Sequence, residues 1–288
     1  MNQKGLEKNL VEAIKIAVTS VTHETEEALK EASKREEKEG PQVQLKAILE
    51  NIDIGKEEER PICQDTGTPT FFVEVGSDFP FTDKLKETIT SAVRRATEEV
   101  PLRPNAVDPI VDKNSNDNTG RFIPAIHWEI VDGKEADIHV MPKGGGSENM
   151  SKLEMMTPGR GLKGVKEIVL EHVAEMEGKA CSPTIIAIGL GGGSDLALEL
   201  AKKALLRPVG VRHPEERIAE LEEELLEKCN ELGVGPMGVG GETTVLDVKI
   251  EYAHRHPASF PVAIVPQCWA NRQSTVHIDA EGNSKVIE

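Results

Sequence analysis

Short apolar segments typical of strands alternate with amphipathic segments typical of helices along almost the whole chain, and no Gly/Ser-rich linker interrupts them. Strand formers gather in the ranges Thr70–Gly76, Ala125–Val131, Ala136–Met141, Thr184–Ile188, Thr243–Tyr252 and Val262–Pro266. Helical spacing of apolar residues extends to Ile52 and recurs over Asp83–Glu99, Gly164–Met176, Asp195–Leu206 and Pro214–Leu232. This alternation predicts an α/β fold with mixed β-sheets flanked by helices, in a single integrated domain over residues 1–288.

Long loops interrupt this pattern. The stretch from Val100 to Gly120 carries three prolines and a polar Asn/Ser/Asp run, and loops of that length in a compact domain usually carry function. Two glycine-rich segments, Lys143–Ser147 and Gly189–Ser194, are further candidates. The second lies between a predicted strand and a predicted helix, where backbone N–H groups can bind an anion. A tight strand-to-helix turn explains the same glycines equally well.

Composition excludes several classes of protein. A net charge of −16 and an aromatic content of 3% argue against a nucleic-acid-binding platform, which needs a basic field and stacking side chains. No segment has the roughly 18 apolar residues of a membrane span, and the N-terminus lacks the apolar core of a signal peptide. We therefore expect a cytoplasmic protein with no membrane and no nucleic-acid partner. In a reducing compartment, its four cysteines are poor candidates for disulfides.

Three of the cysteines, Cys63, Cys181 and Cys268, lie among Gly, Pro and polar residues typical of loops. Cys229 instead lies on the apolar stripe of a predicted helix, where a buried core thiol is expected. The three loop cysteines are too far apart in the sequence for a compact zinc or ferredoxin motif. Their spacing alone is compatible with three unrelated thiols, and also with three ligands that converge in the fold.

Polar residues near these cysteines are candidates for chemistry. Gln64 and Asp65 directly follow Cys63, although Asp65 can equally cap the turn at Gly67. Arg103 in the long loop is suited to hold a carboxylate, or is a solvated loop arginine. His256 precedes the third loop cysteine by only a short segment, but most histidines at strand ends are structural or exposed.

Several blocks together resemble the α subunit of the two-subunit class I (iron–sulfur) fumarate hydratases and of the related L(+)-tartrate dehydratases. The resemblance covers nearly the whole chain. It is carried by the blocks Ile62–Gly67, Leu102–Asn105, Asn116–Gly120, Pro142–Asn149, Cys181–Pro183, Gly189–Asp195, His254–His256 and Cys268–Arg272. Several multi-residue blocks in the right order make a specific match.

The resemblance implies a [4Fe-4S] cluster with three cysteine ligands, Cys63, Cys181 and Cys268, and one iron left open to substrate. It also implies which side chains and backbone groups line the substrate pocket: Gln64, Asp65, Arg103, Gly144, Gly145 and His256. Of these, Asp65 and His256 are the implied catalytic residues. The glycine that contacts the substrate is assigned only to within one residue.

The implied reaction is the reversible hydration of fumarate to L-malate, with the open iron as the Lewis acid. Asp65 is then the candidate acid or orienting group for the leaving oxygen, and Arg103 neutralises a carboxylate of the dicarboxylate substrate. The resemblance further implies a β subunit that supplies the general base and more cationic groups, in an α2β2 assembly.

Three alternatives remain at this point. The chain can be the α subunit of an L(+)-tartrate dehydratase, which differs in the treatment of a second hydroxyl group. It can be a non-catalytic α/β module whose glycine loops bind anions. In a third alternative Cys63 is a lone nucleophile beside His256, and the other cysteines are dispensable.

Overall fold

A computed structural model describes residues 2–287 and divides the chain into two compact units. The first unit consists of residues 2–22, Asn51–Gly145 and residues 272–287, and the second of His23–Glu50 and Gly146–Asn271. The mixed α/β class with helix-flanked sheets is confirmed. The chain passes between the units four times, so neither is a continuous sequence segment. A single catalytic domain over residues 1–288 stays a prediction.

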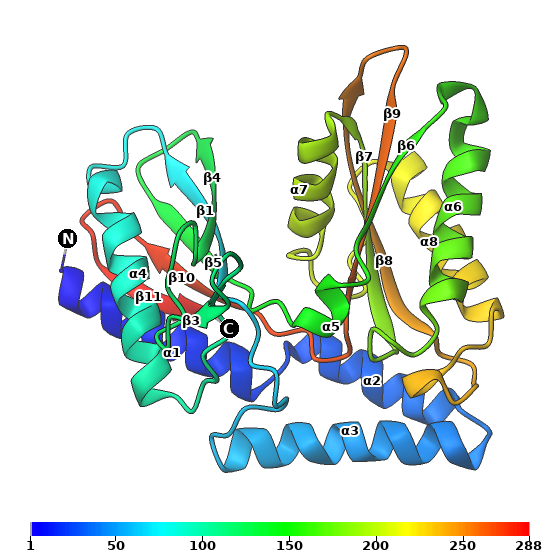
Figure 1. Ribbon diagram of the computed structural model, residues 1–288, viewed down its shortest axis with the longest axis horizontal. Helices are drawn as coiled ribbons and strands as arrows, with labels where there is room; N and C mark the ends of the chain where they lie inside the picture. The colour runs from blue at the N-terminus through cyan, green and yellow to red at the C-terminus, as the bar shows by residue number, and fades with distance from the viewer. Residues whose placement is uncertain (1, 288) are drawn as a thin grey trace. The chain divides into compact units, whose positions relative to one another are not determined.

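The first unit is built on a sheet with the strand order β11-β10-β5-β1-β4 (Figure 1). Its central strand, β1 (Thr70–Gly76), pairs in parallel with β4 (Ala125–Val131) and antiparallel with β5 (Ala136–Val140). The remaining strands, β10 (Ser274–Ile278) and β11 (Ser284–Ile287), come from the C-terminal segment. Helices α1 (Gln3–Thr19) and α4 (Thr82–Glu99) share one apolar core with these strands.

The long loop after α4 is ordered by its asparagines. It contains a small ribbon of β2 (Val107–Asp108) and β3 (Lys113–Asn114). The buried Asn118 side chain accepts a hydrogen bond from Asn105 N at 2.6 Å and donates one to Arg103 O at 3.1 Å. These bonds fix the backbone around residue 103 in the absence of regular secondary structure.

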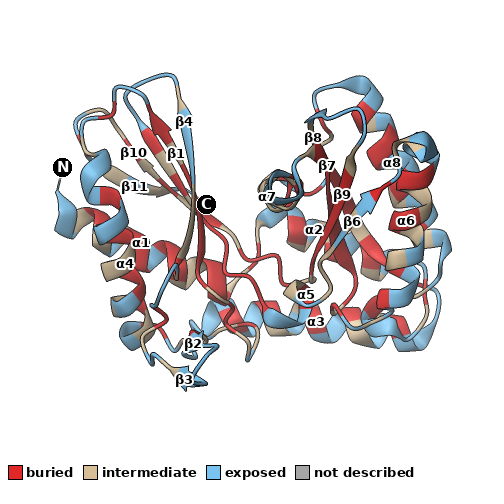
Figure 2. Cartoon of the chain, turned by 45° about the horizontal axis from the view of Figure 1, so that its top comes forward, coloured by how far each residue is buried: buried red, intermediate tan, exposed pale blue. Residues whose placement is uncertain are grey.

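The second unit has a sheet with the strand order β6-β9-β7-β8. Strand β7 (Thr184–Gly192) is parallel to β8 (Val245–Arg255) and antiparallel to β9 (Phe260–Gln267), which pairs with β6 (Lys152–Met156). Helix α7 (Ser194–Ala204) covers one face, and α6 (Gly161–Met176) and α8 (Glu216–Glu231) cover the other (Figure 1). Both faces of β7 are covered, so its apolar run is buried almost without interruption (Figure 2).

The other elements are short or peripheral. Helix α2 (His23–Arg35) belongs to the second unit, and α3 (Glu39–Glu57) passes from the second unit into the first. Helix α5 (Gly145–Glu148) follows the first glycine loop, and η1 (Pro158–Arg160) and η2 (Pro236–Gly238) are single 3-10 turns. Within residues 2–287, no helix has both the length and the apolar character that crossing a membrane requires.

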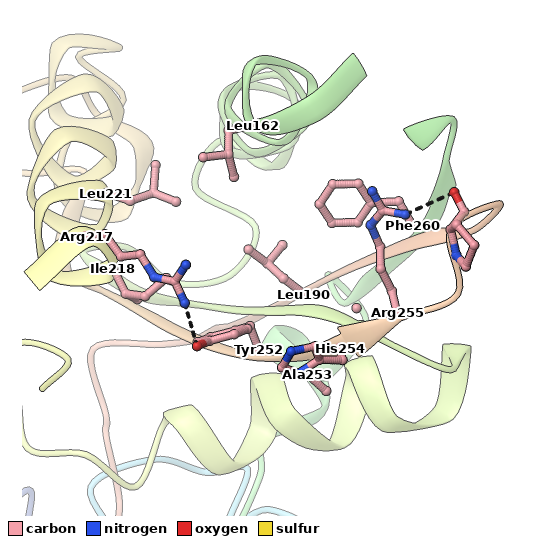
Figure 3. Close-up of a pocket in the computed structure, with 12 residues that line it drawn as sticks. Leu162, Leu190, Arg217, Ile218, Leu221, Tyr252, Ala253, His254, Arg255 and Phe260 are labelled. Atoms are coloured by element: carbon pink, nitrogen blue, oxygen red, sulfur yellow. Dashed lines mark hydrogen bonds between the residues drawn. The ribbon is translucent and has the colours of Figure 1, made fainter. Parts of the chain in front are cut away.

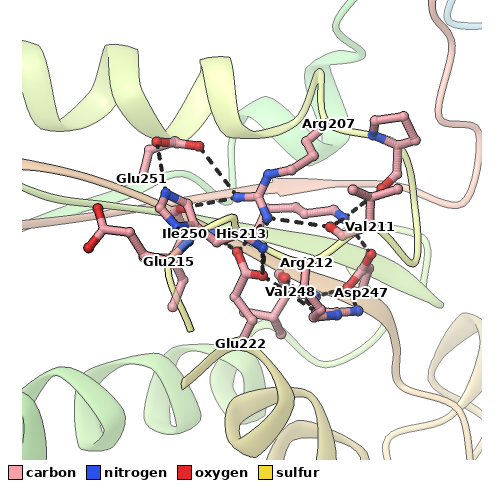
Figure 4. Close-up of polar contacts among 12 residues, drawn as sticks. Arg207, Val211, Arg212, His213, Glu215, Glu222, Asp247, Val248, Ile250 and Glu251 are labelled. Carbon is pink, nitrogen blue, oxygen red and sulfur yellow. Dashed lines mark hydrogen bonds and ion pairs between the residues drawn. The ribbon is translucent and has the colours of Figure 1, made fainter. Parts of the chain in front are cut away.

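Charged side chains cover the exposed edge of β8 (Figure 4). Arg207 donates to the Ile250 carbonyl at 2.9 Å, Arg212 donates to the Val248 carbonyl at 3.1 Å, and Ile250 N donates to Glu222 at 2.7 Å. Edge strands with free backbone groups invite pairing with other chains. Here the side chains occupy those groups, so the network is a structural cover for the sheet edge.

Beneath this cover, Lys249 and Asp247 form a fully buried ion pair, with Nζ and Oδ2 2.8 Å apart. Lys249 also donates to the carbonyls of Pro208 and Val211, each at 2.6 Å. Desolvation lowers the pKa of Lys249, although the Asp247 carboxylate partly opposes the shift. Two of the ammonium's three contacts thus hold the loop after α7 against β8, and the third is to Asp247 of the same strand.

We expect Lys249→Met to lower the free energy of unfolding by about 3 kcal/mol, because it removes one partner of a buried ion pair. The matched control is Lys163→Met in α6, whose side chain is 88% exposed; it should change stability by no more than about 0.5 kcal/mol. Urea denaturation of both variants measures the difference. Equal stability of the two would contradict the structural role of the network.

Candidate active site

Asp65 joins two loops in the first unit. One of its carboxylate oxygens accepts a hydrogen bond from Gly67 N at 2.9 Å, and the other accepts from Gly145 N at 2.7 Å. Gly67 has a φ of +83°, which favours glycine at this turn. Asp65 therefore caps its own turn, as one alternative held, and also binds the first glycine loop. Three predicted site residues, Asp65, Gly144 and Gly145, are thereby brought together.

Within the glycine triplet, Gly144 has the least space. A Cβ atom there would lie 3.0 Å from Arg272 Nη2 and 3.3 Å from Asp65 Oδ2. The same addition at Gly145 would come no closer than 3.7 Å to Asp65, and at Gly146 no closer than 4.0 Å to the nearest atom. Gly144 is thus the position where the absence of a side chain matters for the site.

Cys63, Gln64 and Arg103 line a cavity of about 310 Å³ in the same unit. The thiol of Cys63 is free and half-exposed, and the Gln64 and Arg103 side chains are exposed. The backbone of Arg103 is held firmly, since its N–H donates to Thr66 Oγ1 at 3.1 Å. A fixed backbone with an exposed guanidinium is suited to bind a carboxylate.

Sequence reasoning missed two members of this region. Arg60 lines the same cavity, although in the sequence it stands at the end of a charged run and looks like an ordinary solvated residue. Asn105 donates to Gly67 O at 3.1 Å and so supports the Asp65 turn. The position of Arg60 directly before Pro61 and the cysteine loop was the only available signal.

Cys181 and Cys268 are neighbours in the second unit. Cys181 shortly precedes β7 and Cys268 follows β9, and these strands are paired with Ile185 opposite Gln267. Trp269 N donates to the carbonyl of Cys181 at 3.2 Å, which joins the two loops directly. Both residues are half-exposed. Cys181 has a φ of +57°, a strained conformation that is typical of functional sites.

Cys229 differs from the other three cysteines in its burial and in its position within a helix. It is fully buried in α8, and burial raises the pKa of its thiol to about 12. A thiol that resists deprotonation is a poor metal ligand. Its assignment to the core from helical periodicity is confirmed.

The donor set fits an iron–sulfur cluster in chemistry, because such clusters are bound by accessible cysteine thiolates. Cys63 belongs to the first unit and Cys181 and Cys268 belong to the second. Considered separately, neither unit's described residues contain a group of three His, Cys, Asp or Glu side chains able to hold a metal ion. The three-cysteine ligand set therefore stays a prediction.

His256 is not close to the cysteines of its own unit. It lies in the turn between β8 and β9, where its Nδ1 accepts a hydrogen bond from Ala258 N at 3.1 Å. Strand β9 separates it from Cys268, and a strand of that length spans about 26 Å. His256 and Cys268 therefore lie at opposite ends of an extended strand, although they are close in sequence. The structure does not bring His256 together with Cys181 and Cys268, and a pairing of His256 with Cys63, which belongs to the first unit, stays a prediction.

The turn that carries His256 adjoins a mostly apolar cavity of about 580 Å³ (Figure 3). Leu162, Leu190 and Leu221 contribute to its lining, and Arg255 lies with its guanidinium carbon 4.6 Å from the centroid of the Phe260 ring. None of the predicted cysteine, substrate-binding or catalytic residues lines this cavity.

The second glycine loop is explained by close packing. A Cβ atom on Gly189 would collide with the Ala197 carbonyl, and one on Gly191, whose φ is +81°, with the Ala253 carbonyl. At Gly193, the N-cap of α7, a Cβ atom would lie 2.6 Å from a carboxylate oxygen of Asp195. A negative charge already stands at this helix end, so the geometry favours the tight-turn explanation over an anion site.

Comparison with known proteins shows which family the chain belongs to. The sequence model of the fumarate hydratase (Fumerase) family matches residues 7–277. The chain belongs to the fumarate hydratase family. Fumarate hydratases are hydro-lyases, and the family recognised from the sequence blocks is confirmed.

Two relatives show how far the similarity extends. A protein of Methanocaldococcus jannaschii, provisionally named L(+)-tartrate dehydratase subunit alpha, is 46% identical over 273 residues, which cover 93% of this chain and 96% of that protein. L(+)-tartrate dehydratase subunit alpha of Escherichia coli (strain UTI89) is 40% identical over 235 residues, 81% of this chain and 78% of that protein. The chain thus resembles single subunits over most of their length.

Proposed function

We propose that this fumarate hydratase family member is the α subunit of a [4Fe-4S]-dependent hydro-lyase that reversibly hydrates fumarate to L-malate. The observation that carries the proposal is the Asp65 clamp, in which a carboxylate is fixed by two backbone N–H groups beside the cavity of Cys63, Gln64 and Arg103. A fixed carboxylate, an exposed guanidinium and an accessible thiol in one small region match the needs of dehydrating a hydroxy dicarboxylate.

Cys63, Cys181 and Cys268 would hold the cluster. When bound, it would supply a Lewis-acidic iron that lowers the barrier to loss of the hydroxyl group. Arg103, with Arg60 on the same cavity, would bind a substrate carboxylate and fix its orientation. The exposed Gln64 amide would donate a hydrogen bond to the substrate.

Asp65 would act on the oxygen that leaves or enters at the substrate's hydroxyl carbon. Its carboxylate is fixed before the substrate binds, so it can hold a proton at Oδ or orient the hydroxyl group without further rearrangement. His256, implied as a second catalytic residue, lies at the far end of the sheet of its unit and has no step in this proposal.

A partner chain would complete the site. Both relatives are named as subunit alpha, and a dehydration also needs a base for the C–H proton. We propose that a β subunit supplies that base and further cationic groups in an α2β2 assembly, located in the cytoplasm. The isolated chain should bind the cluster but turn over fumarate poorly. Strong activity without the partner would contradict the proposal that this chain supplies only part of the active site.

L(+)-tartrate dehydration is the second candidate, and the names of both relatives favour it. Anaerobically reconstituted chain and partner should be assayed with L-malate, fumarate and L(+)-tartrate in parallel. A kcat/KM for L-malate above that for tartrate supports the first candidate, and the reverse order supports the second. No turnover of any of the three would contradict the proposed function.

Replacing Gly144 by Ala should lower kcat/KM by about 10- to 100-fold, because the new methyl group would displace Asp65 or Arg272, which lie 3.3 and 3.0 Å from the Cβ position. Gly146→Ala is the matched control, since its methyl group would meet nothing closer than 4.0 Å. Steady-state kinetics of the two variants measure the difference. Equal kinetics in both would argue against Gly144 as the critical glycine.

A further inference from the structure

Arg272 is a buried cation without a carboxylate partner. It lies two residues before β10 in the first unit, is 1% exposed and is among the largest fully buried side chains. Its Nη1 donates to the carbonyl oxygen of Asp65 at 2.6 Å, and no residue in the described range accepts a hydrogen bond from its Nε. Among residues 2–287, no carboxylate lies within ion-pair distance of this guanidinium.

Such a group is costly in an ordinary protein core. A buried charge loses its hydration, and removal from water is tolerated when an opposite charge or a full set of hydrogen bonds replaces it. Arg207 and Arg212 in the second unit show the usual solution, because each forms an ion pair with Glu222 or Asp247. Arg272 has no such partner, so its charge is available to an anion that the folded chain does not itself provide.

The position of Arg272 indicates where an anion attracted by its charge would bind. Its Nη2 lies 3.0 Å from the point where a Cβ atom of Gly144 would stand, and Asp65 Oδ2 lies 3.3 Å from the same point. The guanidinium is therefore behind the glycine loop and against the main chain of Asp65. Cys63, Gln64 and Thr66, which flank Asp65, line the cavity proposed for the substrate.

We propose that Arg272 is a positioning residue of this site, an inference that rests on the proposed hydro-lyase function. The hydrogen bond from its guanidinium Nη1 fixes the main chain of Asp65, so that the carboxylate meets the amides of Gly67 and Gly145. Its positive charge, which forms no ion pair within the described residues, stands behind the cavity and attracts a dicarboxylate into a chain whose net charge is −16. Arg272 acts through Asp65 and through its field, without touching the substrate.

Two substitutions distinguish the role of the planar guanidinium of Arg272 from the role of its positive charge. Arg272→Met removes both, and Arg272→Lys retains a positive charge but loses the planar fork. Arg94→Met is the matched control, because the Arg94 side chain in α4 is 58% exposed. All variants are prepared as the reconstituted complex with the partner subunit, and their iron content is measured first, so that a lost cluster is recognised.

Hydrogen exchange of peptides covering Gly67 and Gly145 reports the position of Asp65 and needs no turnover. We expect faster exchange of these peptides in Arg272→Met and Arg272→Lys, and wild-type exchange in peptides from β7 and in Arg94→Met. Wild-type exchange in Arg272→Met would overturn the positioning role. Because the assay is independent of catalysis, it decides this point even if the complex turns over no dicarboxylate and the proposed function fails.

Inhibition by succinate, an unreactive dicarboxylate, reports the charge. The inhibition constant should rise about tenfold or more in Arg272→Met, as expected for the loss of a charge-assisted interaction. It should stay within about threefold of wild type in Arg272→Lys, because the charge is retained. Unchanged inhibition in Arg272→Met, or an equal loss in both variants, would overturn the electrostatic role.

Discussion

Asp65→Asn lowers kcat of the reconstituted enzyme by about 100- to 10,000-fold in our account, the range typical of a lost general acid–base group. Asn keeps the size of the side chain but cannot accept or release a proton at this position. In addition, Asn has an NH2 group, which only donates, in place of one carboxylate oxygen. It therefore cannot accept hydrogen bonds from both Gly67 N and Gly145 N as Asp65 does. Steady-state kinetics with L-malate and fumarate measure the effect.

Asp132→Asn is the control for this substitution. Asp132 is exposed in the turn between β4 and β5, a place where Asn is equally favourable, so kinetics and stability should match wild type. Iron content should be the same in all three proteins. An Asp65→Asn enzyme that keeps its cluster and retains kcat within about twofold would remove Asp65 from the chemistry.

Loss of any one loop cysteine should abolish activity and cluster binding together. Cys63→Ser, Cys181→Ser and Cys268→Ser each remove one of three thiolates, and a cluster held by only three protein ligands has none in reserve. We expect iron and sulfide contents near background in all three variants. Anaerobic reconstitution followed by iron and sulfide analysis checks this result.

Cys229→Ser is the matched control for the three cysteine variants. Cys229 is fully buried in α8, so the new hydroxyl group should lower stability by about 1–3 kcal/mol and leave the iron content unchanged. If Cys181→Ser and Cys268→Ser retained activity while Cys63→Ser lost it, the lone-nucleophile alternative would replace the cluster.

Local sequence patterns predicted most of the elements correctly. Apolar runs such as 184–188 and helical stripes such as 214–232 depend on burial within one element, which the sequence displays directly. Strand β6 was missed, because Lys152–Met156 contains no β-branched or aromatic residue. No compositional boundary marks the division into two compact units, because the chain crosses between them four times.

The candidate site was predictable where its residues are neighbours in sequence. Cys63, Gln64 and Asp65 are consecutive, and the family blocks identified them together. Arg272 is far from Asp65 in the chain, and only the folded structure shows that it is buried and donates to the Asp65 carbonyl. His256 and Cys268 are close in sequence, but the full length of β9 lies between them in the fold.

The most direct test of the central claim is the iron and acid-labile sulfide content of the wild-type chain, prepared anaerobically with its partner. Iron and sulfide should be present in equal amounts, as a [4Fe-4S] cluster requires, with broad thiolate-to-iron absorbance near roughly 400 nm. Both signals should disappear together in Cys268→Ser and persist in Cys229→Ser. A wild-type complex that binds neither iron nor sulfide but still hydrates fumarate would contradict the account.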